Sequence, residues 1–250
     1  MTLTKERNQE TSVFSGLVTT EKTENIGKIH EIKLNPFLIA KNFNLGLRKP
    51  IHWKIKRIFD FTSSIIGIIL ISPVLLFIAM AIKLESKGNV LFKQKRVGLY
   101  GKNFYIYKFR SMEQNAEKKF DSLKDFNDSN SVMFKMFNDP RITKVGKIIR
   151  KYSLDELPQL FNVIKGEMSL VGPRPPIQAE VDNYEKWHYL KFSTLPGLTG
   201  MWQVSGRSKI KDFNRVIGLD YRYISNWDLK LDLCLLLRTI SVVIKGKGAA

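Results

Sequence analysis

Residues Phe61–Ile82 read FTSSIIGIILISPVLLFIAMAI, a stretch of 22 residues without a charge. As an α-helix that rises about 1.5 Å per residue, the stretch is about 33 Å long, which matches the hydrocarbon core of a bilayer. No other stretch of the sequence approaches this length. A buried core helix is the alternative, but 22 uncharged residues are long for one. The stretch therefore predicts membrane insertion.

Two features argue against an ordinary transmembrane span. Ser72 and Pro73 lie near the middle of the stretch, where a proline costs roughly 3 kcal/mol because it removes a backbone donor and clashes with the preceding turn. The flanks are equally basic, although a spanning helix is expected to have an asymmetry of Lys and Arg. We predict a re-entrant helix–break–helix hairpin with both ends on the cytoplasmic side; a kinked span is the alternative. The basic residues are Arg48, Lys49, Lys54, Lys56 and Arg57 before the stretch, and Lys83, Lys87, Lys93, Lys95 and Arg96 after it.

The composition narrows the class of protein. The chain has 250 residues, of which 41 are Lys or Arg and 23 are Asp or Glu, giving a formal net charge of +18. Hydrophobic residues make up 44%, which excludes a chain that is disordered throughout. The single cysteine, Cys234, excludes an intrachain disulfide and a cysteine-built metal site. The basic charge fits nucleic acid, an anionic membrane surface or phosphorylated substrates equally well.

The rest of the chain predicts an α+β fold that is mainly helical. Residues 1–50 resemble a loosely ordered extension, residues 51–84 form the membrane segment, and residues 85–250 form one further domain. Within this domain we expect two short strands and two helices, with a polar insert between them; no cleavable signal peptide is visible. The ranges are strands at 89–98 and 103–110, a polar insert at 113–138, a helix at 142–149 and an amphipathic helix at 228–244.

Adjacent carboxylates, Asp155 and Glu156, open an apolar segment and are the first candidates for chemistry. One interpretation is a capping box, in which Ser153 caps a helix and Glu156 reaches back to it. A capping role and a chemical role are compatible, because the positive end of a helix lowers the pKa of a carboxylate and keeps it ionised. An ionised Asp155 is then available as a nucleophile or as a metal ligand.

A rigid turn follows at Gly172–Pro175, with the sequence GPRP. Pro173 and Pro175 restrict the backbone on either side of Arg174, whose planar guanidinium suits bidentate contact with phosphate oxygens. Arg150 is a second candidate phosphate ligand. A surface loop and an ordinary charge at a helix end are the alternatives for these two arginines. The glycine-rich segment 196–207 either shapes a nucleotide or sugar pocket or is a packed loop.

Together these motifs resemble the bacterial sugar transferase family, the monotopic polyprenyl-phosphate phosphoglycosyl transferases. The resemblance covers residues 54 to about 244, some three quarters of the chain, with several long motifs in the family's order. They are KRIFD (56–60), Ser72–Pro73, YKFRSM (107–112), DPRIT (139–143), SLDELPQL (153–160), KGEMSLVGPRP (165–175) and PGLTGMWQVSGR (196–207).

The resemblance implies transfer of a sugar-1-phosphate from a UDP-sugar to undecaprenyl phosphate, with release of UMP. By motif match, Asp155 is the nucleophile that forms a phosphosugar-aspartyl intermediate, and Glu156 assists through Mg²⁺ or as an acid or base. Mg²⁺ would be held by one or both of these carboxylates. The positions that match residues near the phosphates are Arg150, Pro173, Arg174, Pro175 and Arg207, with Lys108 and Arg110 as weaker matches.

The same resemblance implies a small catalytic domain with amphipathic interfacial helices, facing the cytoplasm at the bacterial inner membrane. The product would initiate exopolysaccharide, capsule, O-antigen or glycoprotein glycan synthesis. Larger relatives carry several N-terminal spans and a further domain, which residues 1–50 lack, so we expect a minimal catalytic unit. The sugar and the oligomeric state, a homodimer included, stay open.

Two other functions compete with this one. A glycosyltransferase that moves the sugar alone to a lipid acceptor would release UDP. A basic membrane scaffold would bind anionic lipid without catalysis, since each Lys or Arg near an anionic leaflet contributes about 1 kcal/mol. Nucleic acid is not an expected partner, because the basic residues cluster at the membrane flanks and no recognition module is present.

Overall fold

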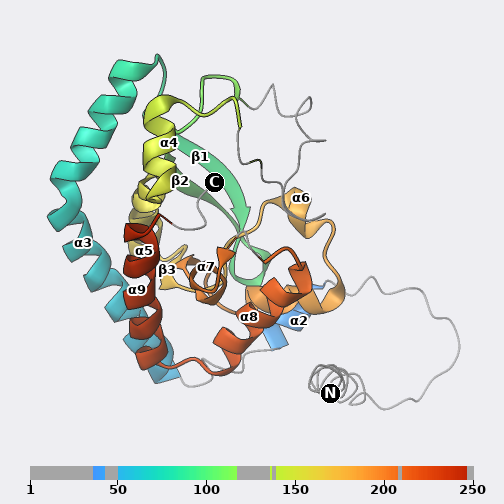
Figure 1. Cartoon of the computed structure of the whole chain (residues 1–250). Coiled ribbons are helices and arrows are strands. Elements are labelled where there is room, and N and C mark those ends of the chain that lie inside the picture. The colour runs from blue at the N-terminus through green and yellow to red at the C-terminus, as the bar shows by residue number, and fades with distance from the viewer. Residues whose placement is uncertain (1–35, 43–49, 117–135, 137–138, 208–209, 247–250) are drawn as a thin grey trace, which may run out of the picture. The chain divides into compact units, whose positions relative to one another are not determined.

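The computed structural model describes residues 36–42, 50–116, 136, 139–207 and 210–246 (Figure 1). Helices dominate these residues, as the sequence predicts, and the strands form two small two-stranded sheets. The α-helices are α2 (Phe37–Asn42), α3 (Pro50–Glu85), α4 (Lys144–Lys151), α5 (Leu160–Lys165), α6 (Gln178–Val181), α7 (Met201–Val204), α8 (Phe213–Ser225) and α9 (Leu229–Ile244). The 3-10 helices are η1 (Leu99–Gly101), η4 (Leu154–Gln159) and η5 (Lys186–Ser193). The strands are β1 (Leu91–Val97), β2 (Asn103–Phe109), β3 (Ser169–Val171) and β4 (Gly197–Thr199).

Helix α3 contains the long apolar stretch and continues for 36 residues through Pro73. Pro73 has no backbone N–H to offer the carbonyl of Ile69, four residues earlier. The hydroxyl of Ser72 donates to that carbonyl at 2.8 Å, so Ser72 supplies a substitute for the lost hydrogen bond. The predicted division into two helices at Ser72–Pro73 is therefore not observed. Instead, α3 follows a bowed path along one flank of the domain (Figure 1).

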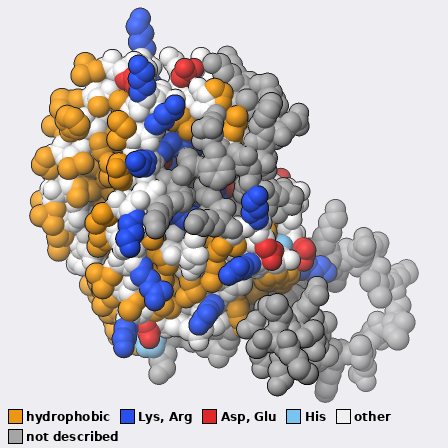
Figure 2. Space-filling model, viewed as in Figure 1, with side chains coloured by type: hydrophobic (Ala, Val, Ile, Leu, Met, Phe, Trp, Pro, Cys, Tyr) orange, Lys and Arg blue, Asp and Glu red, His pale blue; other side chains and the backbone are white. Residues whose placement is uncertain are grey.

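The outer face of α3 is apolar and exposed. Its most apolar window has a mean hydropathy of 2.9, yet only 11% of that window is buried. The core helix of a soluble domain would be mostly buried, so α3 is not such a helix. Figure 2 shows hydrophobic side chains gathered over the flank where α3 lies. Its length and exposed apolar face make α3 a candidate for contact with a bilayer. The most exposed of its large apolar side chains are Ile69, Leu70, Phe77 and Leu84.

Helix α9 has the amphipathic pattern predicted for residues 228–244. It begins after Asp228, whose carboxylate accepts a hydrogen bond from the backbone N–H of Leu231 at 2.6 Å and caps the helix. Leu235 on one side is buried, whereas Leu237 and Ile244 on the other side are exposed. The exposed side adds a second apolar strip to the surface of the protein.

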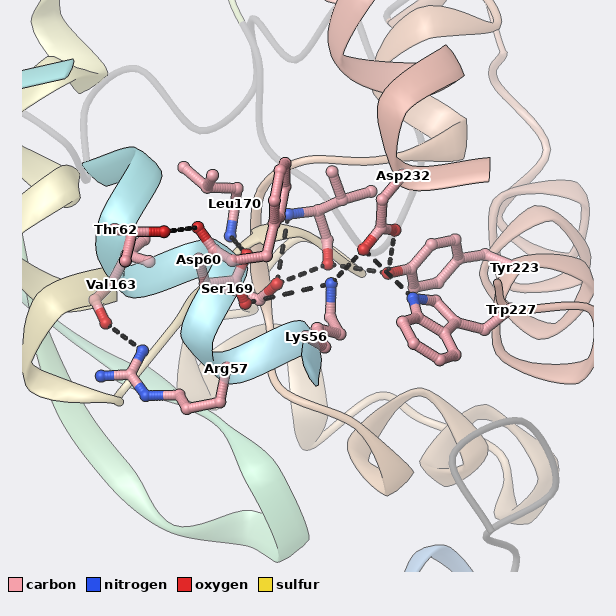
Figure 3. Close-up of polar contacts among 12 residues, drawn as sticks. Lys56, Arg57, Asp60, Thr62, Val163, Ser169, Leu170, Tyr223, Trp227 and Asp232 are labelled. Carbon is pink, nitrogen blue, oxygen red and sulfur yellow. Dashed lines mark hydrogen bonds and ion pairs between the residues drawn. The ribbon is translucent and has the colours of Figure 1, made fainter. Parts of the chain in front are cut away.

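A buried polar cluster attaches the N-terminal part of α3 to α9 (Figure 3). The Lys56 ammonium lies 2.6 Å from Asp232 and 4.0 Å from Asp60, and all three side chains are almost fully buried. Asp232 also accepts hydrogen bonds from the Tyr223 hydroxyl at 2.8 Å and from the Trp227 indole at 3.1 Å. A buried charge is tolerated only when it is paired and hydrogen-bonded, so this cluster fixes where α3 lies against the domain.

The C-terminal part of α3 is attached to the same domain by other contacts. The Glu85 carboxylate accepts from the backbone N–H of Val145, at the start of α4, at 3.1 and 3.2 Å. The Arg110 guanidinium donates to the carbonyls of Ser86 and Lys87, directly after the helix. An apolar cluster lies beside these contacts and contains Ile78, Ile82, Phe109 and Ile149. Both ends of α3 therefore contact one domain.

Strands β1 and β2 form the antiparallel hairpin that the sequence predicts, with Val97 opposite Asn103. Side chains alternate across β2: Phe104 and Ile106 enter the core, and Lys108 lies next along the same face. This alternation directs Lys108 toward η4 rather than into solvent. The parallel pair β3 and β4 joins the segment after α5 to the glycine-rich segment.

Part of the predicted N-terminal extension is folded. Helix α2 packs Phe37 edge-on against Tyr189 and Phe192, with ring centroids 5.0 and 5.2 Å apart. Residues 1–35 and 43–49, and most of the polar insert at 113–138, lie outside the described residues. The prediction of loose order thus does not hold for 36–42 and is untested for the remainder.

We predict that Lys56→Met destabilises the protein by about 3–5 kcal/mol, because it leaves Asp232 as a buried charge without its cation. Lys54→Met removes an exposed lysine two residues away and serves as the matched control. Thermal unfolding in nanodiscs measures both. Equal midpoints for the two variants would contradict a structural role for the buried pair.

Candidate active site

The acidic pair lies in an irregular segment between α4 and α5. Helix α4 ends at Lys151, and Ser153 adopts a left-handed conformation with φ of 53°. This conformation is costly for a residue other than glycine and is frequent at functional sites. The chain then forms η4, which carries Asp155 and Glu156 in its first turn.

The predicted capping box is not formed. Ser153 makes no side-chain cap; its hydroxyl accepts a hydrogen bond from the Arg207 guanidinium at 2.9 Å. The Glu156 carboxylate accepts from the Lys108 ammonium at 2.7 Å instead of turning back to Ser153. Tertiary partners thus take both side chains that the local motif would use.

Glu156 is kept ionised by its surroundings. Burial opposes its charge, but Lys108, Arg207 and Arg174 outweigh that effect and lower the pKa of Glu156 below its ordinary value. Lys108 makes the only direct ion pair of Glu156 among the described residues. This carboxylate therefore bears a negative charge at neutral pH.

Asp155 is in the opposite situation. Its side chain is 8% exposed, and burial raises its pKa to about 6, against the attraction of Lys108 and Arg150. The lowered pKa expected from a helix end is therefore wrong, because desolvation is the larger effect here. At pH 7 most Asp155 carboxylates are still ionised. A poorly solvated carboxylate that stays ionised is a better nucleophile than one surrounded by water.

Four cations converge on this pair. Lys108 and Arg150 act electrostatically on Asp155, and Lys108, Arg174 and Arg207 act on Glu156. They come from β2, α4, the GPRP turn and a position three residues after the end of α7, so only the tertiary structure assembles them. Two carboxylates among four cations leave a positive surplus, which suits a phosphorylated ligand.

The GPRP turn is fixed by hydrogen bonds to two of its backbone carbonyls. The Pro173 carbonyl accepts from Gly197 at 2.9 Å, and the Pro175 carbonyl accepts from the Arg96 guanidinium at 3.0 Å. A Cβ at Gly172 would lie 2.4 Å from the Leu195 carbonyl, so close packing here requires glycine. The glycine-rich segment therefore supports the turn, and its last residue, Arg207, donates to Ser153 in the acidic segment.

Arg110 does not join the group around the acidic pair. Its guanidinium donates to Ser86 and Lys87 at the end of α3, where it holds the chain after the helix. Lys108, two residues earlier on β2, takes the place beside Glu156. The motif YKFRSM thus contributes one residue to the site and another to the attachment of α3.

The sequence analysis missed the charged residues behind Arg174. Glu180 accepts two hydrogen bonds from Arg174, at 3.0 and 3.2 Å, and Arg96 lies buried beside them. Lys191 and Asp220 form a further buried ion pair at 3.4 Å. The available signal was weak: Lys191 stands alone between apolar neighbours, which hints at a buried, paired charge.

Asp155 and Glu156 are also the candidates for holding Mg²⁺. Within the described ranges, no group of three or more His, Cys, Asp and Glu side chains is placed to hold a metal. Mg²⁺ often uses only one or two protein carboxylates together with phosphate oxygens and water. The acidic pair fits that donor set, and among the described residues Lys108 pairs with Glu156 and leaves Asp155 without an ion pair of its own.

Comparison with known proteins places these residues in a family. The model of the bacterial sugar transferase family matches residues 51–246, which include α3, the acidic pair and α9. The chain belongs to the bacterial sugar transferase family. The resemblance seen in the sequence motifs is thereby confirmed.

Several relatives in this family carry names that describe sugar or phosphosugar transfer. The galactosyl transferase CpsE of Streptococcus agalactiae is 44% identical over 207 residues, covering 83% of this chain and 46% of CpsE. The undecaprenyl-phosphate galactose phosphotransferase of Salmonella typhimurium is 42% identical, covering 78% of this chain and 41% of that protein. The exopolysaccharide production protein ExoY of Rhizobium meliloti is 38% identical, covering 86% of this chain and 96% of ExoY. The chain thus spans less than half of the first two relatives and nearly all of ExoY.

We predict that Asp155→Asn stabilises the folded protein at pH 7.5, by at most about 3 kcal/mol, since one pKa unit corresponds to about 1.4 kcal/mol. The folded protein holds the Asp155 proton up to about pH 6, and the unfolded chain only up to about pH 4. This contribution to the stability of the wild type therefore falls as the pH rises through this window, whereas the variant lacks the contribution.

Denaturant unfolding at several pH values between 4 and 7.5 measures this difference. The exposed Asp182→Asn variant, which makes the same change in net charge, is the control. A gain for Asp155→Asn that does not change with pH would show that burial of the ionised carboxylate is not its cause.

Proposed function

We propose that this protein transfers a sugar-1-phosphate from a UDP-sugar to undecaprenyl phosphate. The observation that carries the proposal is the buried carboxylate of Asp155 beside Glu156, with Lys108, Arg150, Arg174 and Arg207 around the pair. The names of the relatives support the donor and the acceptor, since they include undecaprenyl-phosphate galactose phosphotransferase and UDP-galactose-lipid carrier transferase.

The first chemical step is attack by Asp155. A carboxylate oxygen forms a bond to the sugar-bearing phosphorus of the UDP-sugar, and the bond from that phosphorus to the bridging oxygen breaks, so UMP leaves with the electron pair. The enzyme then carries a phosphosugar-aspartyl group. Lys108 and Arg150, which face Asp155, reduce the repulsion between the carboxylate and the phosphate.

The second step regenerates the enzyme. A phosphate oxygen of undecaprenyl phosphate attacks the same phosphorus, and the bond from phosphorus to Asp155 breaks. The products are undecaprenyl diphosphate sugar and the free Asp155 carboxylate. Because the reaction has two displacements, the water-soluble donor and the lipid acceptor react one after the other at the same place beside Asp155.

Glu156, Arg174 and Arg207 have supporting roles in binding the donor. Arg174 and Arg207 are directed at the phosphate groups of the donor, and Glu156 orients Lys108 through their ion pair. Mg²⁺ held by Asp155 and Glu156 would neutralise phosphate charge and favour departure of UMP. We do not assign Arg110 to substrate binding, because both of its terminal nitrogens donate at the end of α3.

We also propose that the membrane segment, residues 51–84 of α3, enters the membrane and returns to the same side. Its two ends contact one domain, through Lys56 and Asp232 at the start and through Glu85 and Val145 at the end. If α3 crossed the bilayer, Asp232 and Val145, which belong to one domain, would have to lie on opposite sides of a hydrocarbon core about 30 Å thick. The bowed path of α3 and the basic residues on both flanks suit re-entry from the cytoplasmic side.

This arrangement makes residues 85–250 a catalytic domain at the cytoplasmic face of the bacterial inner membrane. The apolar strip of α9 lies on the lipid surface, where polar and apolar sides of a helix are both accommodated. The phosphate of the lipid acceptor is then at the depth of the membrane surface, close to the domain. The role that fits such an enzyme is to initiate synthesis of a polysaccharide that is assembled on the membrane. The relative ExoY is named for exopolysaccharide production.

Incubation with UDP-galactose or UDP-N-acetylgalactosamine, Mg²⁺ and undecaprenyl phosphate tests the reaction by its nucleotide product. We expect UMP from the wild type, and a loss of at least 1,000-fold with Asp155→Asn together with loss of the covalent adduct in mass spectrometry. Asp182→Asn is expected to retain wild-type activity. Release of UDP, or UMP formation undiminished in Asp155→Asn, would refute the mechanism.

Cysteine labelling tests the topology. In a Cys234→Ser background, we introduce Ile51→Cys at the first residue of the membrane segment and Lys95→Cys after the segment; both positions are exposed. A membrane-impermeant maleimide should label both positions only from the cytoplasmic side, because re-entry returns the chain to that side. Labelling of the two positions from opposite sides would establish a span.

A further inference from the structure

Arg174 is held from behind by a carboxylate that no motif of the sequence indicates. The Glu180 side chain, on α6, accepts hydrogen bonds from both terminal nitrogens of Arg174, at 3.0 and 3.2 Å, and is almost fully buried. This bidentate contact fixes the plane of the guanidinium as well as its position. On its other side, Arg174 interacts electrostatically with Glu156 of the acidic pair.

A second arginine, Arg96, also interacts with Glu180, so Glu180 does not neutralise the positive charge of Arg174 alone. Arg96 is buried on β1 and donates to the Pro175 carbonyl and to Gln94, but it has no carboxylate within ion-pair distance among the described residues. It acts electrostatically on Glu180 and on Arg174. Glu180 therefore shares its negative charge between two guanidinium groups.

One further ion pair, between Lys191 and Asp220, lies near Arg174 and adds no net charge. Lys191 and Asp220 pair at 3.4 Å and both face Arg174. When all five groups are ionised, three cations (Arg96, Arg174, Lys191) face two carboxylates (Glu180, Asp220), which leaves one positive charge. Arg174 thus presents a fixed guanidinium that is still attractive to an anion.

We infer that Glu180 is a positioning residue, which fixes the guanidinium of Arg174 so that the N–H groups that Glu180 does not use are presented to the phosphates that react at Asp155. The inference rests on the proposed function, because it assigns the orientation of Arg174 to the binding of the donor. The role of Glu180 is indirect: it lies behind Arg174 and acts through it. Misplacing a substrate-positioning group by about 1 Å can cost about 100-fold in rate.

The variant Glu180→Gln separates positioning from charge. It removes a negative charge beside Arg174, so the cluster becomes more positive by one. If charge alone matters, binding of the donor improves and its KM falls. If Glu180 positions Arg174, kcat/KM for the UDP-sugar falls about 10- to 100-fold despite the added positive charge. Asp182→Asn, two residues away and exposed, makes the same change in net charge and should leave kcat/KM unchanged.

A double-mutant cycle with Arg174→Lys identifies the path of the effect. Lysine cannot make the bidentate contact, so Glu180→Gln should have less than about a threefold effect in the Arg174→Lys background. Should Glu180→Gln fail to fold in a thermal melt, Glu180→Asp replaces it, because this variant keeps the charge and withdraws the carboxylate by one methylene group.

The outcomes are distinguishable. Wild-type protein that releases no UMP from either UDP-sugar overturns the proposed function and the inference with it. Active wild type with a Glu180→Gln variant of equal or higher kcat/KM overturns the inference alone. Full additivity of the two substitutions also overturns it, because Glu180 would then act independently of Arg174.

Discussion

The buried ion pair between Lys56 and Asp232 sets the position of α3 against the rest of the protein. An ammonium and a carboxylate with almost no exposure to solvent stabilise the fold only while they remain paired, so α3 and α9 are held in one relative position. Tyr223 extends the contact, because its hydroxyl lies 2.8 Å from Asp232 and 2.9 Å from the Val171 carbonyl. Val171 ends β3 and leads directly into the GPRP turn. The helix proposed to enter the membrane and the turn that presents Arg174 are therefore parts of one rigid assembly.

A second constraint is the opposition of burial and charge at the acidic pair. Burial alone would raise the pKa of both carboxylates, and the cations alone would lower the pKa of both. The structure divides the two effects: Lys108 pairs with Glu156, whereas Asp155 stays desolvated without an ion pair among the described residues. Because Asp155 is ionised at neutral pH but poorly solvated, it has the chemistry that a nucleophile for phosphate requires. This reactivity costs stability, as is common where activity depends on a strained or desolvated group.

Local sequence patterns failed where tertiary partners compete for the same side chain. Ser153 and Glu156 have the spacing of a capping box, yet Arg207 and Lys108, more than 45 residues away in the chain, take them. A second pattern failed for a local reason. Ser72 and Pro73 signal a break, but the serine hydroxyl donates to the Ile69 carbonyl and replaces the hydrogen bond that the proline removes, so α3 continues.

The sequence by itself determined the apolar helix, the β-hairpin, the amphipathic C-terminal helix and the family, because hydrophobic periodicity and long motifs are local properties of the chain. It also indicated Asp155, Glu156 and Arg174. Only the tertiary structure decided which cation faces which carboxylate, and that Glu180 and Arg96 lie behind Arg174. These contacts join residues that are distant in the sequence, and burial, which sets their charge, exists only once the chain has folded.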